Sequence, residues 1–405
     1  MSKIAIIAPG TLPIPATRGG AVETGIEQLI YENELHSKNV FEVYSCFDIE
    51  AFEKTKSIKN SKFIFYNFGI IDKLEMFFLK CVNKLFSLVK IKKNFNIYPR
   101  FVKFICKNIK KSECDTILIK NSIRFVKPIS KATNIPIVLQ LHNDFLNSET
   151  PECEDIASRC YKIVANSKYI KTRICTINNV NPSNVYINMN CLDKNSLLIP
   201  SENQKNEIAK KFNININRRN IIYVGRIVSV KGIKELLLAL KKIEKNDKWH
   251  LLIVGGKWFS NNSKDKYYKE LEKISESFKD RISFLGYVNH EEIKTLYALS
   301  SIAVVPSIWE EPAGRVVLEA EAMGIPVIAS NSGGIPEYVN KKSAIIVDKD
   351  EFFIENLSKS IEELVNDTDK AVLIGNEGKK YAQLFTSERY YDEILKIMGV
   401  NTEND

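Results

Sequence analysis

Residues 301–337 read SIAVVPSIWEEPAGRVVLEAEAMGIPVIASNSGGIPE, a pattern typical of a strand, a loop and a helix. The apolar residues 302–305 predict a buried parallel strand, which the loop 308–313 follows before a helix opens near Gly314. In open α/β sheets, ligands bind in the crevice beyond the carboxyl ends of the strands. The loop that holds Glu311 is therefore a candidate ligand site.

Two carboxylates of this stretch, Glu311 and Glu319, are expected to lie in different kinds of secondary structure. Pro312 disfavours an α conformation at Glu311, which should remain in the loop, whereas Glu319 lies a turn or more inside a mostly apolar helix. A carboxylate on such a helix needs a polar partner, because burial without one is costly, and a polyol ligand would serve. The alternative is a solvated acidic face formed by Glu310, Glu311, Glu319 and Glu321.

The surroundings of these two glutamates resemble a known family. The seven residues between Glu311 and Glu319, which include Pro-Ala-Gly, and the later Gly-Ile-Pro-Val strand and Gly-Gly-Ile-Pro-Glu at 333–337, are similar to the retaining family-four glycosyltransferases, or glycosyl transferases group 1. The resemblance implies an α/β fold of the GT-B type, with two Rossmann-like doubly wound domains whose parallel sheets face each other across a cleft. It also implies that Glu319 binds the ribose hydroxyls, while Glu311 and the backbone of Ala313 and Gly314 hold the donor sugar.

Length and composition indicate two globular domains. The chain has 405 residues, of which 44% are hydrophobic and 26% are charged, so it is long enough for two cores. The range 196–220, rich in Asn, Lys, Ser and Glu, marks a boundary, and we predict domains at 1–200 and 201–385. The resemblance implies that residues 386–405 form a helix that crosses back to the first domain.

Composition also excludes several classes of protein. No run of 18 apolar residues occurs and the amino terminus is not a secretory signal, so we expect a cytoplasmic protein. The eight cysteines lie in the first half without a C-x-x-C pair, and the four histidines form no zinc-like pattern. We therefore predict no metal site and no cofactor, the nucleotide sugar being a substrate.

A glycine-bearing loop at 10–20 joins a predicted strand at 3–9 to a predicted helix at 21–36. It lacks the G-x-G-x-x-G pattern that binds dinucleotides, so the main sequence evidence for a dehydrogenase is missing. Glycines at the amino terminus of a helix let a phosphate or sugar approach the backbone. The resemblance places a donor-facing Gly-Gly pair at Gly19 and Gly20; the alternative is a flexible turn.

His142 directly follows a predicted strand over 136–141. A lone histidine at a strand end is usually a hydrogen-bonded structural residue. The family places a histidine at this point close to the transferred sugar, so the resemblance implies a catalytic role for His142.

Two cations mark the start of the second domain. The sequence at 221–237 predicts a strand that ends at Gly225 and Arg226, followed by a helix that begins near Lys231. Two cations and helix amides could hold a diphosphate and stabilise the charge that grows on it as it leaves; the alternative is two solvated cations. The family uses the same pattern to grip the nucleotide diphosphate. The resemblance adds two donor contacts on later strands, Gly255 and Val288.

A basic block lies in the first domain. Residues 54–131 contain 19 Lys and Arg against four acidic residues, a surplus of +15 in a chain whose net charge is +9. We interpret this range as a basic amphipathic insert, because between about 72 and 111 apolar residues recur at helical spacing with lysines on another side. Such helices suit an anionic membrane surface; the alternative is that the apolar faces pack on the sheet. We expect no nucleic acid partner, since nucleic acid would not require so apolar an opposite face.

We therefore predict a retaining hexosyltransferase that moves a sugar from a nucleotide diphosphate, most simply a UDP-sugar, to an acceptor hydroxyl. The acceptor would be a sugar or a lipid-linked glycan, such as an intermediate of lipopolysaccharide or capsule, and the protein would be peripheral on the inner face of the membrane. The predicted catalytic residues are Glu311, His142, Arg226 and Lys231. Two alternatives stay open: a nucleotide-sugar epimerase of the same architecture, and a non-catalytic basic membrane-binding protein.

Overall fold

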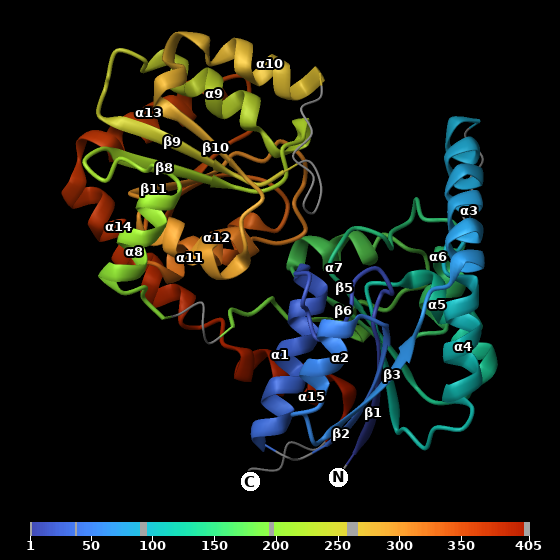
Figure 1. Cartoon of the computed structure of the whole chain (residues 1–405). Helices are drawn as coiled ribbons and strands as arrows, with labels where there is room; N and C mark the ends of the chain where they lie inside the picture. The colour runs from blue at the N-terminus through green and yellow to red at the C-terminus, as the bar shows by residue number, and fades with distance from the viewer. Residues whose placement is uncertain (1, 37–38, 90–94, 194–197, 257–265, 401–405) are drawn as a thin grey trace. The chain divides into compact units, whose positions relative to one another are not determined.

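The computed structural model describes residues 2–36, 39–89, 95–193, 198–256 and 266–400. It divides into two compact units, Met1–Cys191 with Ser387–Asp405, and Leu192–Thr386 (Figure 1). The sequence suggested boundaries at 200/201 and 385/386. The predicted end of the basic helix at 90–94 lies outside the described residues.

The first unit is built on a seven-stranded parallel sheet in the order β3-β2-β1-β4-β5-β6-β7. Its strands are β1 (Lys3–Ile7), β2 (Val40–Cys46), β3 (Ser61–Tyr66), β4 (Thr116–Lys120), β5 (Ile137–Leu141), β6 (Lys162–Ala165) and β7 (Val185–Ile187). Side chains alternate between two cores: Ile4 and Ile6 enter one, Ala5 and Ile7 the other. Because both faces are covered, the strands read as nearly continuous apolar runs.

Helices cover both faces of this sheet. They are α1 (Ala21–His36), α2 (Ile49–Thr55), α3 (Ile70–Leu88), α4 (Pro99–Ile109), α5 (Ile123–Ala132), α6 (Cys153–Ser158), α7 (Lys168–Ile174) and α15 (Ser387–Met398), with a 3-10 turn η1 (Pro182–Asn184). The predicted helix over 21–36 is confirmed as α1. The helix α15 lies beside α1 in the same unit, although the whole second unit separates them in the sequence (Figure 1).

The second unit has a six-stranded parallel sheet in the order β10-β9-β8-β11-β12-β13. Its strands are β8 (Arg219–Val224), β9 (Trp249–Val254), β10 (Ile282–Gly286), β11 (Ile302–Val305), β12 (Val327–Ser330) and β13 (Ala344–Val347). Its helices are α8 (Glu202–Lys211), α9 (Ile233–Lys242), α10 (Lys266–Ile274), α11 (His290–Ala298), α12 (Arg315–Ala322), α13 (Phe353–Asn366) and α14 (Thr368–Ala382), with 3-10 turns η3 (Ser229–Lys231), η4 (Glu276–Arg281) and η5 (Ile335–Tyr338). Two doubly wound parallel sheets are confirmed, as the GT-B architecture requires.

The basic range 54–131 is built into the first sheet rather than inserted beside it, since it contains β3 and β4. Its two amphipathic helices differ. The apolar face of α4, with Phe101, Ile105 and Ile109, is buried in the core, so the prediction of a membrane-facing α4 is wrong. The apolar residues of α3 stay largely exposed. Among the described helices, none is long and apolar enough to cross a membrane.

Candidate active site

Glycines stand at the carboxyl ends of three neighbouring strands of the second unit. Gly225 follows β8, Gly255 follows β9, and Gly286 ends β10. The N–H of Gly225 donates to the carbonyl of Val254 at 3.0 Å, and that of Gly255 to the carbonyl of Gly286 at 2.8 Å. A Cβ on Gly255 would lie 2.0 Å from the Gly225 carbonyl oxygen. At these three glycines no Cβ obstructs a ligand that approaches the backbone.

Lys231 and Glu311 form an ion pair where the loop after β8 meets the loop after β11. The Lys231 ammonium donates to Glu311 Oε1 at 2.5 Å, and the Ser307 hydroxyl donates to the same oxygen at 2.6 Å. The ammonium also lies 5.5 Å from the centre of the Trp309 ring. The sequence assigned these two charges to different parts of the donor, and the structure brings them together.

A close approach of backbones fixes this pair. Gly232 has φ +73° and a Cβ there would lie 1.8 Å from the Pro306 carbonyl oxygen, so only glycine fits between Lys231 and the start of α9. Beside it, the buried Tyr223 hydroxyl donates to the Arg226 carbonyl at 2.9 Å. Burial, with the nearby Glu311 carboxylate, raises the pKa of Tyr223 well above its usual value, so this phenol stays neutral. The Arg226 side chain is exposed at the same edge.

The Gly-Gly pair after β12 holds the Glu311 loop in place. Gly333 has φ +50°, and a Cβ there would lie 2.2 Å from the Glu311 carbonyl oxygen. The same oxygen accepts the N–H of Gly334 at 2.7 Å. Glu310 is engaged elsewhere, since its carboxylate accepts from Lys349 Nζ at 2.5 Å. Glu311, rather than Glu310, is thus the loop carboxylate paired with Lys231.

The carboxylates of α12 do not form a solvated acidic face, so that alternative is wrong. Glu319 accepts from Arg315 Nε at 3.0 Å, and the two side chains are only 14% and 18% exposed. Glu321 is fully buried and its Cγ lies against Gly378 of α14. Burial raises the pKa of Glu321 to about 8, because the opposing effect of the Ser343 side chain, which lowers this pKa, is smaller. The carboxyl group of Glu321 is therefore mostly protonated at neutral pH.

The other predicted donor contacts lie on the same unit. Ala313 and Gly314 directly precede α12. The first backbone N–H groups of a helix have no hydrogen-bond partner within the helix and can therefore bind a ligand. Val288 follows β10 with its side chain buried, so a ligand could reach it only through the backbone. Their roles as donor contacts stay predictions.

In the first unit, His142 directly follows β5 and is 8% exposed. Its N–H donates to Asn121 Oδ1 at 3.1 Å and its carbonyl accepts from Asn166 Nδ2 at 3.4 Å. Asn121 follows β4 and Asn166 follows β6, so three polar residues meet at the carboxyl edge of this sheet. The histidine is thus held by its backbone at the edge where ligands bind in such folds.

The predicted Gly-Gly loop lies before α1. Gly19 and Gly20 have φ +72° and +102°, conformations that favour glycine. A Cβ on Gly20 would lie 2.3 Å from Glu23 Oε2. The pair therefore has a structural reason to be glycine, and its contact with a donor stays a prediction.

Sequence reasoning missed a buried pair at the same edge, Glu23 and Lys120. Lys120 ends β4 fully buried and donates to Gln140 Oε1 at 2.6 Å and to the Tyr390 hydroxyl at 2.7 Å. Burial lowers the pKa of Lys120 to about 7 and raises that of Glu23 to about 7, the latter opposed by a backbone hydrogen bond and by Lys120. The sequence feature that could have indicated this buried site is the lysine at the end of the strand TILIK, which is otherwise mostly apolar.

A hollow of about 460 Å³ opens in the first unit, and its lining includes Asn121, the side chain of which accepts the His142 backbone N–H. The loops after β4 and β5 and the segment before α4 form it, and most of its lining is apolar. The lining includes Phe95, Tyr98, Arg124, Phe125, Asp144 and Phe145. Burial lowers the pKa of Arg124, and Asp144 pairs with Arg173 at 2.8 Å. The hollow therefore combines aromatic rings with one cation and one carboxylate.

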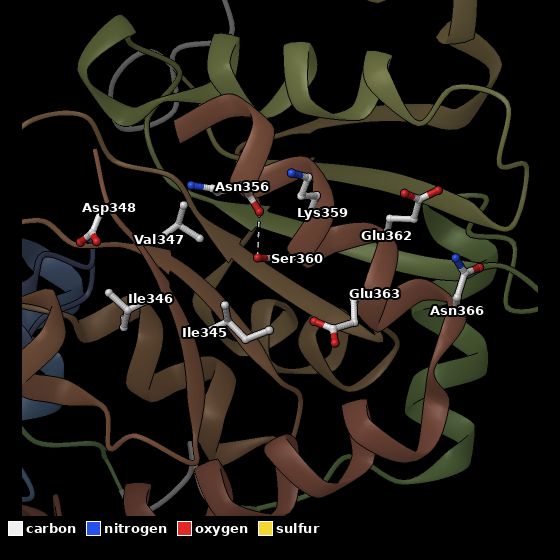
Figure 2. A pocket seen from close by; sticks show the side chains of 10 residues that line it. All are labelled: Ile345, Ile346, Val347, Asp348, Asn356, Lys359, Ser360, Glu362, Glu363 and Asn366. Carbon is white, nitrogen blue, oxygen red and sulfur yellow. Dashed lines mark hydrogen bonds between the residues drawn. The ribbon is translucent and has the colours of Figure 1, made fainter. Parts of the chain in front are cut away.

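A second hollow, of about 700 Å³, lies along the edge strand β13 and α13 (Figure 2). Its lining mixes aliphatic side chains of β13 with polar ones of α13, where the Ser360 hydroxyl donates to the Asn356 carbonyl at 2.9 Å. It contains none of the predicted donor contacts. Among the described residues, no group of three or more His, Cys, Asp or Glu could hold a metal ion.

Comparisons with known proteins agree with the fold and the motifs. Residues 204–381 match the model of the family "Glycosyl transferases group 1". The chain is 26% identical to spore coat protein SA of Bacillus subtilis over 98% of its own length and 100% of that protein. It is 31% identical, over 45% of its length and 47% of the relative, to a GDP-mannose-dependent phosphatidylinositol monomannoside mannosyltransferase of Mycobacterium tuberculosis. Anabaena HepE, solved in complex with UDP-glucose, superposes with a TM-score of 0.74 at 18% identity, covering 99% of this chain and 100% of that one.

The two doubly wound parallel sheets and the superposition on HepE give this chain the GT-B architecture. The chain is a glycosyltransferase, and its second unit belongs to the glycosyl transferases group 1.

Proposed function

We propose that this glycosyltransferase takes its sugar from a nucleotide diphosphate bound to the second unit. The observation that carries the proposal is the Lys231–Glu311 ion pair at the glycine-lined ends of β8 and β9. Lys231 and the exposed Arg226 supply positive charge for a diphosphate, while the Glu311 carboxylate can accept hydrogen bonds from sugar hydroxyls. Glu319, held by Arg315, would accept from the ribose hydroxyls.

We propose a reaction that uses these charges. The bond between the anomeric carbon and the diphosphate oxygen breaks, and its electron pair leaves on that oxygen. The acceptor oxygen bonds to the same face of the carbon, so the configuration is retained, and the acceptor's proton passes to the departing phosphate. Arg226 and Lys231 would stabilise the charge that develops on the diphosphate. Since these cations can do so, we propose that the reaction needs no metal, and that a chelator leaves turnover unchanged.

We propose that the acceptor binds in the hollow of the first unit that Asn121 and Asp144 help to line. Sugar rings present apolar faces that pack on aromatic side chains, and Tyr98 and Phe145 offer such surfaces. Arg124 and Asp144 offer a hydrogen-bond donor and an acceptor for its polar groups. His142, at the rim of the same sheet edge, would lie next to the transferred sugar.

The donor is tested by the thermal stability of the protein with UDP-glucose, GDP-mannose and ADP-glucose. HepE was solved in complex with UDP-glucose and the mycobacterial relative is GDP-mannose-dependent, so we expect a shift with a UDP- or a GDP-sugar. A ligand at a hundred times its dissociation constant stabilises the folded state by about 2.7 kcal/mol. Lys231→Ala should abolish the shift, whereas Lys234→Ala, which removes an exposed cation paired with Glu270, should keep it. No shift with any of the three would refute the donor proposal.

Turnover then separates transfer from epimerisation. Transfer releases free nucleoside diphosphate only when an acceptor is added, whereas an epimerase converts the donor into a new sugar nucleotide. With an acceptor found from a panel of sugars and lipid-linked glycans, Phe145→Ala should raise the acceptor KM and leave donor affinity unchanged. The anomeric proton coupling of the product reports retention, and an inverted product would exclude the same-face reaction.

A further inference from the structure

We propose that α3 docks this protein onto an anionic lipid surface. The helix extends away from the rest of the first unit (Figure 1). Along one side it exposes large apolar residues, each between 57% and 79% accessible: Ile70, Leu74, Phe77, Phe78, Leu85 and Leu88. Their spacing of three, four and seven residues places them on one face. An amphipathic helix of a soluble domain ordinarily turns such a face inward.

The opposite side of α3 is already occupied, so the helix is fixed with its apolar face outward. Asp72 accepts from the Tyr66 hydroxyl at 2.6 Å, and Glu75 pairs with Arg100 at 2.9 Å. Asn83 exchanges two hydrogen bonds, of 2.7 and 2.9 Å, with the backbone of Phe95. These contacts come from two segments on either side of the helix in the sequence, which makes a rotation of α3 costly.

The charges on α3 specify what covers this face. Lys73, Lys80 and Lys84 are exposed and, at 3.6 residues per turn, lie along one flank of the apolar residues. The two acidic residues of the helix are the ones engaged on the packed side. Apolar side chains flanked by lysines suit the boundary between acyl chains and anionic headgroups, where the apolar face is buried and the lysines reach the phosphates. A second copy of the chain would instead bring two surfaces of the same sign together.

This docking bears on the acceptor, a step that rests on the proposed function. Phe95 lines the acceptor hollow and is held by Asn83 of α3, with its ring centre 5.8 Å from that of Phe86. The rim of the hollow is thus attached to the helix that would lie on the lipid. An acceptor whose glycan is carried by a lipid could enter from that surface, so we infer a lipid-linked acceptor.

The test measures partition of the full chain onto vesicles of phosphatidylglycerol and of phosphatidylcholine by co-sedimentation. The parent should bind the anionic vesicles, less so at high salt. Because each lysine near an anionic leaflet contributes about 1 kcal/mol, Lys73→Glu with Lys80→Glu and Lys84→Glu should lower the partition coefficient at least about 100-fold. A Phe77→Ser, Phe78→Ser variant should also lose binding while keeping every lysine.

The matched control carries the same change of charge on the second unit, Lys241→Glu with Lys245→Glu and Lys248→Glu, and should bind as the parent does. Absence of binding by the parent, equal loss in the control, or a parent that dimerises through α3 and ignores vesicles would each overturn the proposal. UDP affinity, measured by calorimetry on every variant, separates the two hypotheses. Retained UDP binding without vesicle binding refutes the docking alone, and the reverse refutes the UDP donor alone.

Discussion

Replacing Glu321 by glutamine should remove a loss of folding stability that the second unit suffers as the pH rises. Glu321 is fully buried between α12 and α14, and burial raises its pKa from 4.5 to about 8. A carboxyl group whose folded pKa is raised binds its proton more tightly in the folded state. Its contribution to stability is therefore complete below about pH 4.5 and is lost as the pH rises through about 8.

The size of the effect follows from the pKa values. At 1.36 kcal/mol per pKa unit, the rise from 4.5 to about 8 corresponds to at most about 5 kcal/mol. Glutamine keeps the shape and stays neutral at every pH. The difference in unfolding free energy between Glu321→Gln and the parent should thus move in favour of the variant by up to that amount between pH 4.5 and 8.

Urea unfolding followed by tryptophan fluorescence is the assay, because all three tryptophans, at 249, 258 and 309, belong to the second unit. The unfolding free energy is extrapolated to water at each pH from 4.5 to 9. Glu362→Gln, an exposed glutamate of α13, is the control and should follow the parent. If the Glu321→Gln and parent curves stay parallel across this range, the carboxyl group is not held protonated and the reasoning fails.

Three further outcomes are expected. Arg226→Ala and Lys231→Ala should each lower turnover by about 10²- to 10³-fold with unchanged circular dichroism, and near-parental rates in both would remove the diphosphate role. Gly333→Ala should weaken donor binding in calorimetry, because a Cβ 2.2 Å from the Glu311 carbonyl must displace that loop; parental affinity would show that the loop tolerates the shift. Tyr390→Phe removes a hydrogen-bond partner of buried Lys120 and should destabilise the first unit by about 1 to 3 kcal/mol, seen as faster amide exchange in β4.

The sequence was enough to predict two doubly wound domains and the loops that carry the candidate site. The alternation of strands and helices and the motif around Glu311 predicted the second sheet. Parallel strands that are buried on both faces appear in the sequence as continuous apolar runs, which are easy to recognise. The helix α8 was missed because its residues are mostly polar and show little apolar periodicity. Its start is marked only by a capping box, in which the Ser201 side chain accepts the Gln204 backbone N–H and the Gln204 side chain accepts the Ser201 backbone N–H.

Long-range contacts were beyond the sequence. The pairing of Lys231 with Glu311 depends on the approach of Gly232 to Pro306, two residues far apart in the chain. The helices α3 and α4 have the same kind of apolar period, yet α4 turns that face inward and α3 outward. Periodicity shows that a helix has an apolar face, and only the neighbouring segments decide what covers it.

The return of α15 to the first unit has a consequence for biosynthesis. A ribosome completes the whole second unit before it makes Ser387–Met398, so the first unit must wait for its last helix while its neighbour can already fold. Until then Lys120 has no Tyr390 to bond, and the apolar side of α1 that α15 covers faces water. A nascent or truncated chain that stops before Ser387 would therefore expose this apolar surface to water.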